Sequence, residues 1–284
     1  MKRLVALYRS PAYSPNLHLQ NDRAILDAVV ERLAGRGWCV AHASEAGVAA
    51  GQLPSGDLYL NMCQGAEASD RLREMLPAGA RCINTPSAVL ACHRHHLIPR
   101  LHRSGVPFPA TVLVATSGPV RDERTVAVSG RNGDPIWVKR GDVHAQSAAD
   151  VAAVPASELG AALARFAERG IGRVALQRHV PGPVVKFYGV AGGEFFHSYR
   201  ADAPDRTAPR ADAEGLRVLA ERAARALGLA VYGGDAVLSA PDAPVLIDLN
   251  DWPSFAPVRA AAAAAIARYA HRYALKDRYS CSTP

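Results

Sequence analysis

Two carboxylates and one amide in the last quarter of the chain are the side chains best suited to chemistry. Asp235 lies in one apolar run, and Asp248 and Asn250 lie in the next, with the turn-forming residues 240–243 between them. If these runs form a β-hairpin around that turn, Asp235 lies directly opposite Asp248. Asn250 shares the face of Asp248, because residues two apart in a strand point to the same side.

Such a cluster predicts a cation site. Like charges directly opposite each other on an antiparallel pair destabilise it, since the Cβ atoms are only about 4.5–5.5 Å apart. An all-oxygen set of ligands suits Mg²⁺ rather than zinc, and Mg²⁺ in proteins usually also contacts substrate phosphates. The hairpin therefore indicates nucleotide chemistry. The alternative is a hairpin at a sheet edge whose carboxylates face water.

The composition limits the number of domains and the cellular compartment that can be expected. With 284 residues, of which 49% are hydrophobic, the chain can form one long domain or two to three compact subdomains. Its five cysteines are an odd number without CxxC spacing, so a disulfide framework is not indicated and a reducing cytoplasm is expected. No signal peptide is expected, and no run approaches the roughly 20 apolar residues of a membrane span. The net charge of +7 comes mainly from dispersed arginine, so a nucleic-acid partner is not indicated.

The first part of the chain alternates strand and helix patterns. Residues 4–8, 38–43 and 57–61 read as strands, and residues 21–35 have helical periodicity. This alternation predicts a small parallel sheet. The loop at 61–65 follows the third strand and is a candidate for the substrate side, because ligands bind at the carboxyl ends of such strands. A plain turn is the alternative.

A helix is predicted from Asn84 to about Arg103, with Thr85 as its cap before a proline. Arg94 lies on its apolar face. A buried guanidinium needs an anion, and either a carboxylate of the fold or a ligand phosphate satisfies this requirement. The nearby histidines do not share one face, which favours a solvated basic surface over a metal site. They are His93, His95, His96 and His102.

A second, separate sheet is predicted after a stiff linker at 106–110. Its strands are expected at 111–115, 125–128 and 135–139, followed by a polar loop at 140–149 and a helix at 157–169. Lys139 in the last strand could reach a phosphate. From spacing alone, a lysine that protects an edge strand from aggregation is the favoured interpretation.

The remaining chain begins with a strand at 174–180, which Pro181-Gly182-Pro183 breaks in the manner of a domain hinge. Strands at 184–190 and 194–200 form a hairpin around Gly192-Gly193. Its register places four residues with polar side-chain atoms on one face and Phe187, Phe196 and Arg200 on the other. The four residues are Lys186, Tyr188, His197 and Tyr199. Helices are expected at 213–227 and 259–275.

In their order and spacing, several stretches between about residues 84 and 255 resemble the ATP-grasp superfamily. They are Asn84-Thr85-Pro86 with its helix, residues 105–111, Trp137-Val138-Lys139, residues 177–182, and Asp235 with Asp248-x-Asn250. The resemblance implies a mixed α/β and α+β fold, in which two α+β subdomains clamp ATP. Residues 1–104 would form an N-terminal parallel α/β domain with a linking helix, 105–176 a central lid, and 177–284 the C-terminal subdomain.

The resemblance also implies roles for individual residues. Lys139 would contact the ATP phosphates, which reverses the preference from spacing alone, and Arg94 stands where family members commonly carry a lysine to these phosphates. The backbone of Gln177, Arg178, His179 and Val180 would meet the adenine. Asp235, Asp248 and Asn250 would bind Mg²⁺.

The implied activity is that of an ATP- and Mg²⁺-dependent ligase. It would activate the carboxylate of a small molecule or peptide as an acyl phosphate, which an amine then attacks. Lys186, His197 and Arg200 are the candidates to hold the acidic substrate, or in the case of Arg200 the acyl phosphate. The alternatives are a kinase for inositol or sugar phosphates and a nucleotide-binding module without turnover. The sequence is compatible with a homo-oligomer.

Overall fold

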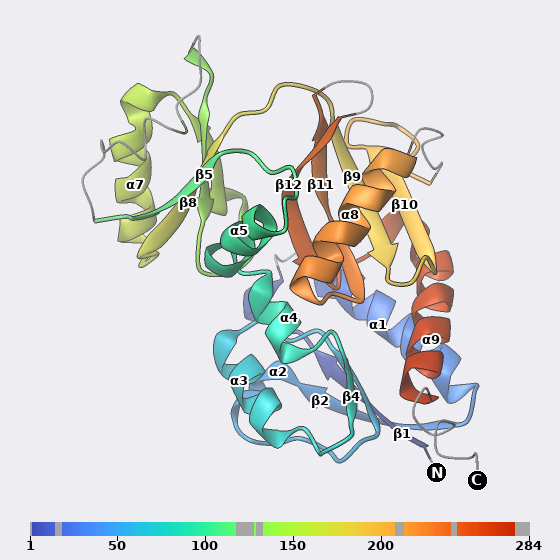
Figure 1. The fold of residues 1–284 in the computed structure, drawn as a ribbon. Coiled ribbons are helices and arrows are strands. Elements are labelled where there is room, and N and C mark those ends of the chain that lie inside the picture. Colours follow the sequence, from blue (N-terminus) through green and yellow to red (C-terminus); the bar gives the residue numbers. More distant parts are fainter. Residues whose placement is uncertain are drawn as a thin grey trace.

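The computed structural model describes residues 2–14, 19–117, 128, 133–207, 213–239 and 243–275. These residues form three four-stranded sheets with helices packed against them (Figure 1). One sheet is parallel and the other two are antiparallel. Within these ranges, no helix has both the length and the apolar character that crossing a membrane requires.

The N-terminal sheet has the order β2-β1-β3-β4, and all its strand pairs are parallel, as predicted. Its strands are β1 (Lys2–Tyr8), β2 (Trp38–Ser44), β3 (Leu58–Asn61) and β4 (Arg81–Ile83). Alternate residues of β1 pack into different cores. Leu4 and Ala6 lie in the core with helix α1 (Leu19–Ala34), whereas Val5 and Leu7 face α2 (Glu45–Ala49) and α3 (Ala66–Met75).

The linking segment is two helices, so the expectation of one continuous helix was wrong. Helix α4 (Pro86–Ala91) ends at Cys92, and α5 (Arg94–Arg103) begins after His93, which has an extended backbone. Burial of the His93 ring, whose Nε2 lies 2.9 Å from the carbonyl oxygen of Gln64, holds this break. The expected cap is present, because the Thr85 hydroxyl accepts from the backbone N–H of Ala88 at 3.2 Å.

The middle sheet is antiparallel, with the order β5-β8-β6-β7. Its strands are β5 (Thr111–Ala115), β6 (Ile136–Arg140), β7 (Val151–Val154) and β8 (Arg173–Arg178). Helix α7 (Leu159–Glu168) packs against it through Leu159, Leu163 and Phe166, as its periodicity predicts. The strand expected at 125–128 lies almost entirely outside the described residues.

The C-terminal sheet is antiparallel, with the order β10-β9-β11-β12. Its strands are β9 (Val184–Val190), β10 (Phe195–Arg200), β11 (Val231–Leu238) and β12 (Pro244–Asp251). Lys186 pairs with Tyr199, which confirms the predicted register of β9 and β10. Asp235 pairs with Asp248 as predicted, but Leu238 pairs with Pro244, one residue out of the predicted register, and an irregularity between Asp235 and Ala236 restores the pairing. The loop between β9 and β10 has four residues rather than two.

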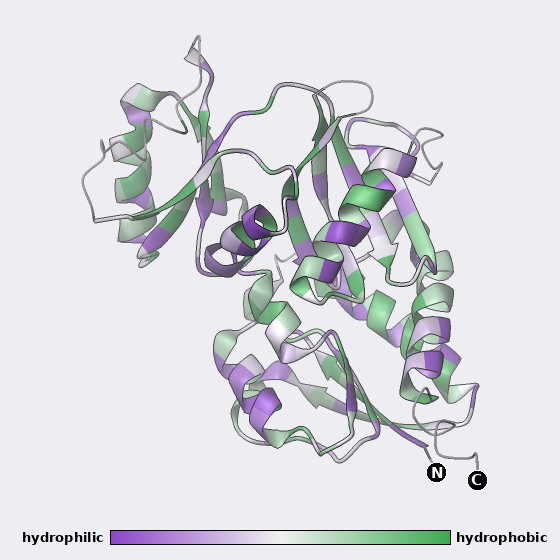
Figure 2. Ribbon diagram, viewed as in Figure 1, coloured by the Kyte–Doolittle hydropathy of each residue, from purple (hydrophilic) through white to green (hydrophobic). Residues whose placement is uncertain are grey.

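Helix α8 (Glu214–Leu227) and α5 cover one face of the C-terminal sheet through a shared apolar core. Figure 2 shows hydrophilic and hydrophobic residues side by side on α5 and α8, as expected for helices with one packed face. The last described helix, α9 (Arg259–Leu275), returns to α1 and the N-terminal sheet. This helix therefore shares a core with the first strand, although the sequence placed it in the C-terminal part.

Candidate functional site

The first of two cavities lies between the middle and C-terminal sheets and has a volume of about 300 Å³. This size is within the range of small-molecule sites. It gathers nine of the residues that the sequence singled out, from α5, β6, the end of β8, β9, β11 and β12. They are Arg94, Lys139, Gln177, Arg178, His179, Val180, Lys186, Asp235 and Asp248.

Each carboxylate of the hairpin has a cation beside it. Lys186 Nζ lies 2.8 Å from Asp235 Oδ1, and Arg94 Nη2 lies 2.7 Å from Asp248 Oδ2. These cations offset the repulsion between the two acids. The anion that Arg94 requires is thus a carboxylate of the fold in this structure, and the guanidinium also donates to the carbonyl oxygen of Arg140 at 2.9 Å.

The protonation of Asp248 follows from its surroundings. Burial raises the pKa of this carboxyl, but the charges of Arg94, Lys139 and His144 outweigh burial, so the pKa lies below its ordinary value. Only 6% of the Arg94 side chain and 18% of the Asp248 side chain are exposed. Asp248 is therefore a carboxylate at neutral pH.

Lys139 is not an edge lysine. Strand β6 lies between β8 and β7, so the aggregation-protecting role favoured by spacing alone does not apply. The side chain is buried, and Nζ donates to the carbonyl oxygen of Ile247 at 3.0 Å. Burial lowers the pKa of Lys139 to about 8, with Arg94 acting in the same direction and Asp248 and Asp235 opposing it. A buried ammonium with a neutral partner can be stabilised by an anionic ligand.

The other end of the first cavity is flat and largely apolar. Trp137 stacks on His179 with ring centroids 6.5 Å apart, and its Nε1 donates to His179 Nδ1 at 3.2 Å. Strand β8 ends at Arg178, so the backbone of His179 and Val180 leaves the sheet where it lines the cavity. This end offers a stacking surface beside main chain that has left the sheet.

A second cavity, of about 690 Å³, lies on the side of the N-terminal sheet. Lys186 and Asp248 line both cavities, so the two meet at these side chains. Its other polar lining residues are Arg9, Tyr13, Asp22, Gln64, His144, Ser147, Asn250 and Asp251. Gln64 belongs to the loop at 61–65, which the sequence proposed for the substrate side.

Two of the predicted substrate residues lie elsewhere. His197 is buried, and its Nε2 lies 2.8 Å from the carbonyl oxygen of Arg206. Arg200 is on the opposite face from Lys186, has half of its side chain exposed, and pairs with Asp202 at 2.8 Å. Neither residue lines the two cavities described above. For Arg200 the reason is strand alternation, which already separated it from Lys186 in the sequence.

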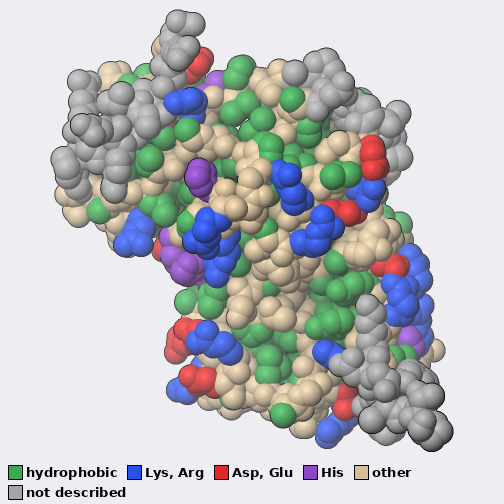
Figure 3. All heavy atoms as spheres, viewed as in Figure 1, with side chains coloured by type: hydrophobic (Ala, Val, Ile, Leu, Met, Phe, Trp, Pro, Cys, Tyr) green, Lys and Arg blue, Asp and Glu red, His purple; other side chains and the backbone are tan. Residues whose placement is uncertain are grey.

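Sequence reasoning missed Arg9, His144 and Asp251. Arg9 follows the first strand directly, and its place at the carboxyl end of a parallel strand was a usable signal. His144 lies in the polar loop at 140–149, where no periodicity points to its burial. The expected solvated basic surface is present at the exposed His96 and His102, and Figure 3 shows basic side chains gathered over α5, whereas His93 is buried.

No protein-family model and no curated protein matched the chain. Comparison with solved structures shows that it has the ATP-grasp fold, which confirms the resemblance and the fold class inferred from the sequence. A D-alanine–D-alanine ligase from Bacillus anthracis complexed with ATP has a TM-score of 0.67 and 11% identity over 98% of this chain and 100% of that chain.

Two further structures extend this likeness. An ATP-grasp RimK domain protein from Sphaerobacter thermophilus has a TM-score of 0.66 and 21% identity over 94% of this chain and 99% of that chain. D-cycloserine synthetase DcsG has a TM-score of 0.63 and 16% identity over the same shares, 94% and 99%. At these identities, the likeness describes the fold.

Proposed function

We propose that this protein is an ATP- and Mg²⁺-dependent ligase, which activates a substrate carboxylate as an acyl phosphate for attack by an amine. The observation that supports this proposal most is the meeting of the two cavities at Lys186 and Asp248. A phosphoryl group at the end of a nucleotide in the first cavity would face an acceptor in the second. Structural neighbours that are named as D-alanine–D-alanine ligases favour a carboxylate as that acceptor.

The first cavity suits ATP along its whole length. In this proposal, the adenine stacks on Trp137 and contacts the backbone of His179 and Val180, where the main chain has left β8. The phosphates extend toward Lys139 and Arg94. Lys139 is buried and hydrogen-bonds a neutral carbonyl, so a phosphate would supply an anionic partner in direct contact with the ammonium.

The hairpin residues suit Mg²⁺. Asp235, Asp248 and Asn250 present carboxylate and amide oxygens, which are the hard ligands that this ion prefers, and Asp248 is ionised at neutral pH. When bound, Mg²⁺ would neutralise charge on the transferring phosphoryl group. Lys186 and Arg94 already hold the two carboxylates in place, and both cations are close enough to turn to nucleotide phosphates.

The protein's own residues would act through position and charge. Lys186 stands where the cavities meet, so its ammonium can stabilise the negative charge that develops on the phosphoryl group in transfer. Arg94 and Lys139 hold the phosphates in line with the acceptor. No protein nucleophile is needed, since the acyl phosphate itself carries the activated carboxylate.

We further propose that residues 105–176 form a lid, with Pro181-Gly182-Pro183 as its hinge against the C-terminal sheet. Closure of the middle sheet would exclude water from the acyl phosphate. The four free cysteines described, Cys39, Cys63, Cys82 and Cys92, suit a reducing cytoplasm.

Incubation with ATP, Mg²⁺ and pools of amino acids, peptides and other carboxylates tests this function. A ligase forms an amide together with ADP and phosphate, whereas a kinase forms ADP and a phosphorylated alcohol, and mass spectrometry distinguishes the two. Lys186→Met should abolish product formation and retain nucleotide binding. Tight ATP binding with no turnover in any pool would instead indicate a nucleotide-binding module.

A further inference from the structure

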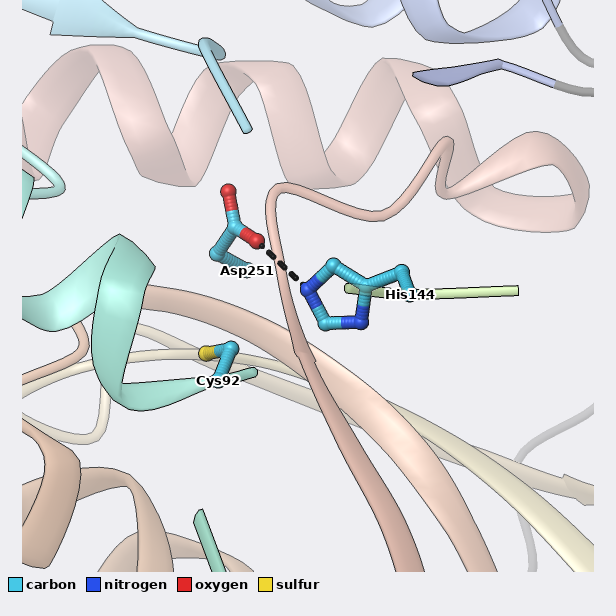
Figure 4. A group of neighbouring side chains, drawn as sticks. All are labelled: Cys92, His144 and Asp251. Carbon is cyan, nitrogen blue, oxygen red and sulfur yellow. Dashed lines mark hydrogen bonds and ion pairs between the residues drawn. The ribbon is translucent and has the colours of Figure 1, made fainter. Parts of the chain in front are cut away.

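Three buried side chains with metal-binding atoms meet beside the second cavity (Figure 4). Cys92 lies in the junction between α4 and α5, His144 lies in the loop after β6, and Asp251 is the last residue of β12. One sulfur, one nitrogen and one oxygen atom from them all lie within 4.8 Å of one another. Cys92 and Asp251 are each 1% exposed, and His144 is 8% exposed.

One atom of this cluster lacks a partner. Asp251 Oδ1 lies 3.1 Å from His144 Nε2 and 3.4 Å from Gln64 Nε2. Asp251 Oδ2 is buried and has no hydrogen bond among the described residues. Its nearest cation is Arg9 Nη2 at 4.0 Å, and the other arm of that guanidinium is bonded to Asp22 at 2.8 Å. A buried carboxylate oxygen without a hydrogen bond is costly. In Figure 4 the Asp251 oxygen bonded to His144 lies on the side of Cys92 and His144, and the other oxygen points away, so Oδ1 is the oxygen that the cluster offers to a ligand.

The donor types identify the class of ligand. Thiolate sulfur, imidazole nitrogen and carboxylate oxygen are the three kinds of ligand that Zn²⁺ takes in proteins, whereas Mg²⁺ takes oxygen. Asp251 is also distinct from the hairpin set, because it follows Asn250 in β12 and neighbouring strand residues point to opposite faces. The cluster therefore has a ligand set of its own, although Asn250 and Asp251 line the same cavity.

We propose that Cys92, His144 and Asp251 form a binding site for a thiophilic divalent cation, with Zn²⁺ as the best fit. His144 and Asp251 line the second cavity, so a cation held by these three ligands has its fourth position open to water or to a substrate atom. On binding, the Cys92 thiol releases its proton to solvent and His144 coordinates as neutral imidazole.

The ligands must close around the ion to reach metal–ligand distances of about 2.0–2.3 Å. His144 can supply this movement, because it lies in a loop rather than in a strand or helix. A bound cation would then fasten the loop after β6 to the end of β12 and to the linking helices. The bound cation, and not the substrate, would then fix the shape of the second cavity.

Spectroscopic titration with Co²⁺ tests the site directly. The full-length protein is freed of metal with a chelator and titrated with Co²⁺, which substitutes for Zn²⁺ and gives a thiolate-to-cobalt absorption band when sulfur is a ligand. We expect this band at one Co²⁺ per chain and its loss when Zn²⁺ is added. Cys92→Ser should lose the band, and Cys39→Ser, which changes an exposed free cysteine, should keep it.

Two further variants keep the test decisive. His144→Gln changes a loop residue and should weaken Co²⁺ binding about tenfold or more with an unchanged circular dichroism spectrum. Asp248→Asn should leave the band in place, because that residue belongs to the other site. Absence of the band in the wild-type protein, or equal binding by the wild type, Cys92→Ser and His144→Gln, would overturn the proposal.

Discussion

Arg94 and Asp248 form an ion pair that joins the linking helices to the C-terminal sheet, with Nη2 2.7 Å from Oδ2 and 154 positions between the two residues. Both side chains are largely shielded from solvent. The pair stands at the junction of the two cavities, so it links the stability of the fold to the proposed chemistry.

Asp248→Asn should affect both properties. Turnover should fall below detection, since the variant loses a Mg²⁺ ligand, and the free energy of unfolding should fall by about 2–3 kcal/mol, since a buried Arg94 charge loses its partner. Product assays and urea unfolding measure these effects. Asp202→Asn, in an exposed pair with Arg200, should leave the unfolding free energy unchanged within the error of the measurement. Wild-type turnover in Asp248→Asn would contradict the metal assignment.

The affinity for ATP should depend on pH through Lys139. The pKa of this lysine is about 8 in the folded protein, against an ordinary value of 10.5, and bound phosphates favour its charged form. Affinity should therefore fall as the pH rises through about 8, toward a tenfold loss per pH unit, because binding then requires uptake of a proton. Lys139→Met should bind more weakly with no such step, and isothermal titration in Mg²⁺ buffers compares the two slopes.

The lowered pKa of Lys139 also predicts the direction in which the unfolding free energy changes with pH. The unfolded chain holds the Lys139 proton more tightly than the folded protein does, so the lysine contributes an unfolding free energy that increases as the pH rises. Protons bound in the unfolded state exceed those in the folded state between about 8 and 10.5, so stability rises with pH across this window. Urea unfolding of the wild type and Lys139→Met would show a difference that changes across the window, and a constant difference would contradict it.

Nucleotide binding should change the fluorescence of Trp137. Of the three tryptophans, Trp137 lines the first cavity, whereas Trp38 and Trp252 are buried in the core around the N-terminal sheet. Stacking of adenine should quench Trp137 emission. Trp38→Phe should keep the ATP-dependent change and Trp137→Phe should lose it, with binding in both checked by calorimetry. An undiminished change in Trp137→Phe would place the nucleotide elsewhere.

Gly234→Ala should disturb the proposed metal site without touching its ligands. A Cβ at Gly234 would clash with the backbone oxygen of Asp248 and lie 2.7 Å from the Phe187 ring, so β11 and β12 must move apart. We expect a loss of about 1–3 kcal/mol in unfolding free energy and a lower affinity for Mg²⁺–ATP. Gly215→Ala, in an open position of α8, should stabilise by about 0.4–1 kcal/mol. Unchanged stability in Gly234→Ala would show that the strands are not held this closely.

The sequence was most informative about local features of the fold. The periodicity of α7 placed Leu159, Leu163 and Phe166 in its core. The pairing of Asp235 with Asp248 was also predicted, although it depends on an irregularity between Asp235 and Ala236 that the turn at 240–243 does not reveal. It was least informative where strands are short, as at β4 and β7, which carry too few residues for a pattern. The break between α4 and α5 depends on the contact of His93 with Gln64, which no local signal reveals.

In the candidate site, too, local patterns could be predicted and long-range contacts could not. Alternation within β9 and β10 is a local pattern, and it is sufficient to place Lys186 and Arg200 on opposite faces. The burial of Lys139 follows from the order of strands in the middle sheet, which its own strand does not encode. His144 and Asp251 are 107 positions apart, and only the packing of the middle loop against β12 brings them together.

The return of α9 to the N-terminal sheet bears on how the chain is made. Residues of α9, among them Ala263 and Ile266, complete the core that contains Leu4 of β1. A ribosome delivers β1 early and α9 late, so one face of the first sheet stays without its cover until nearly all the described chain has emerged. Folding of the N-terminal part is therefore coupled to synthesis of α9, and fragments that stop before residue 259 would expose this apolar surface to aggregation and proteolysis.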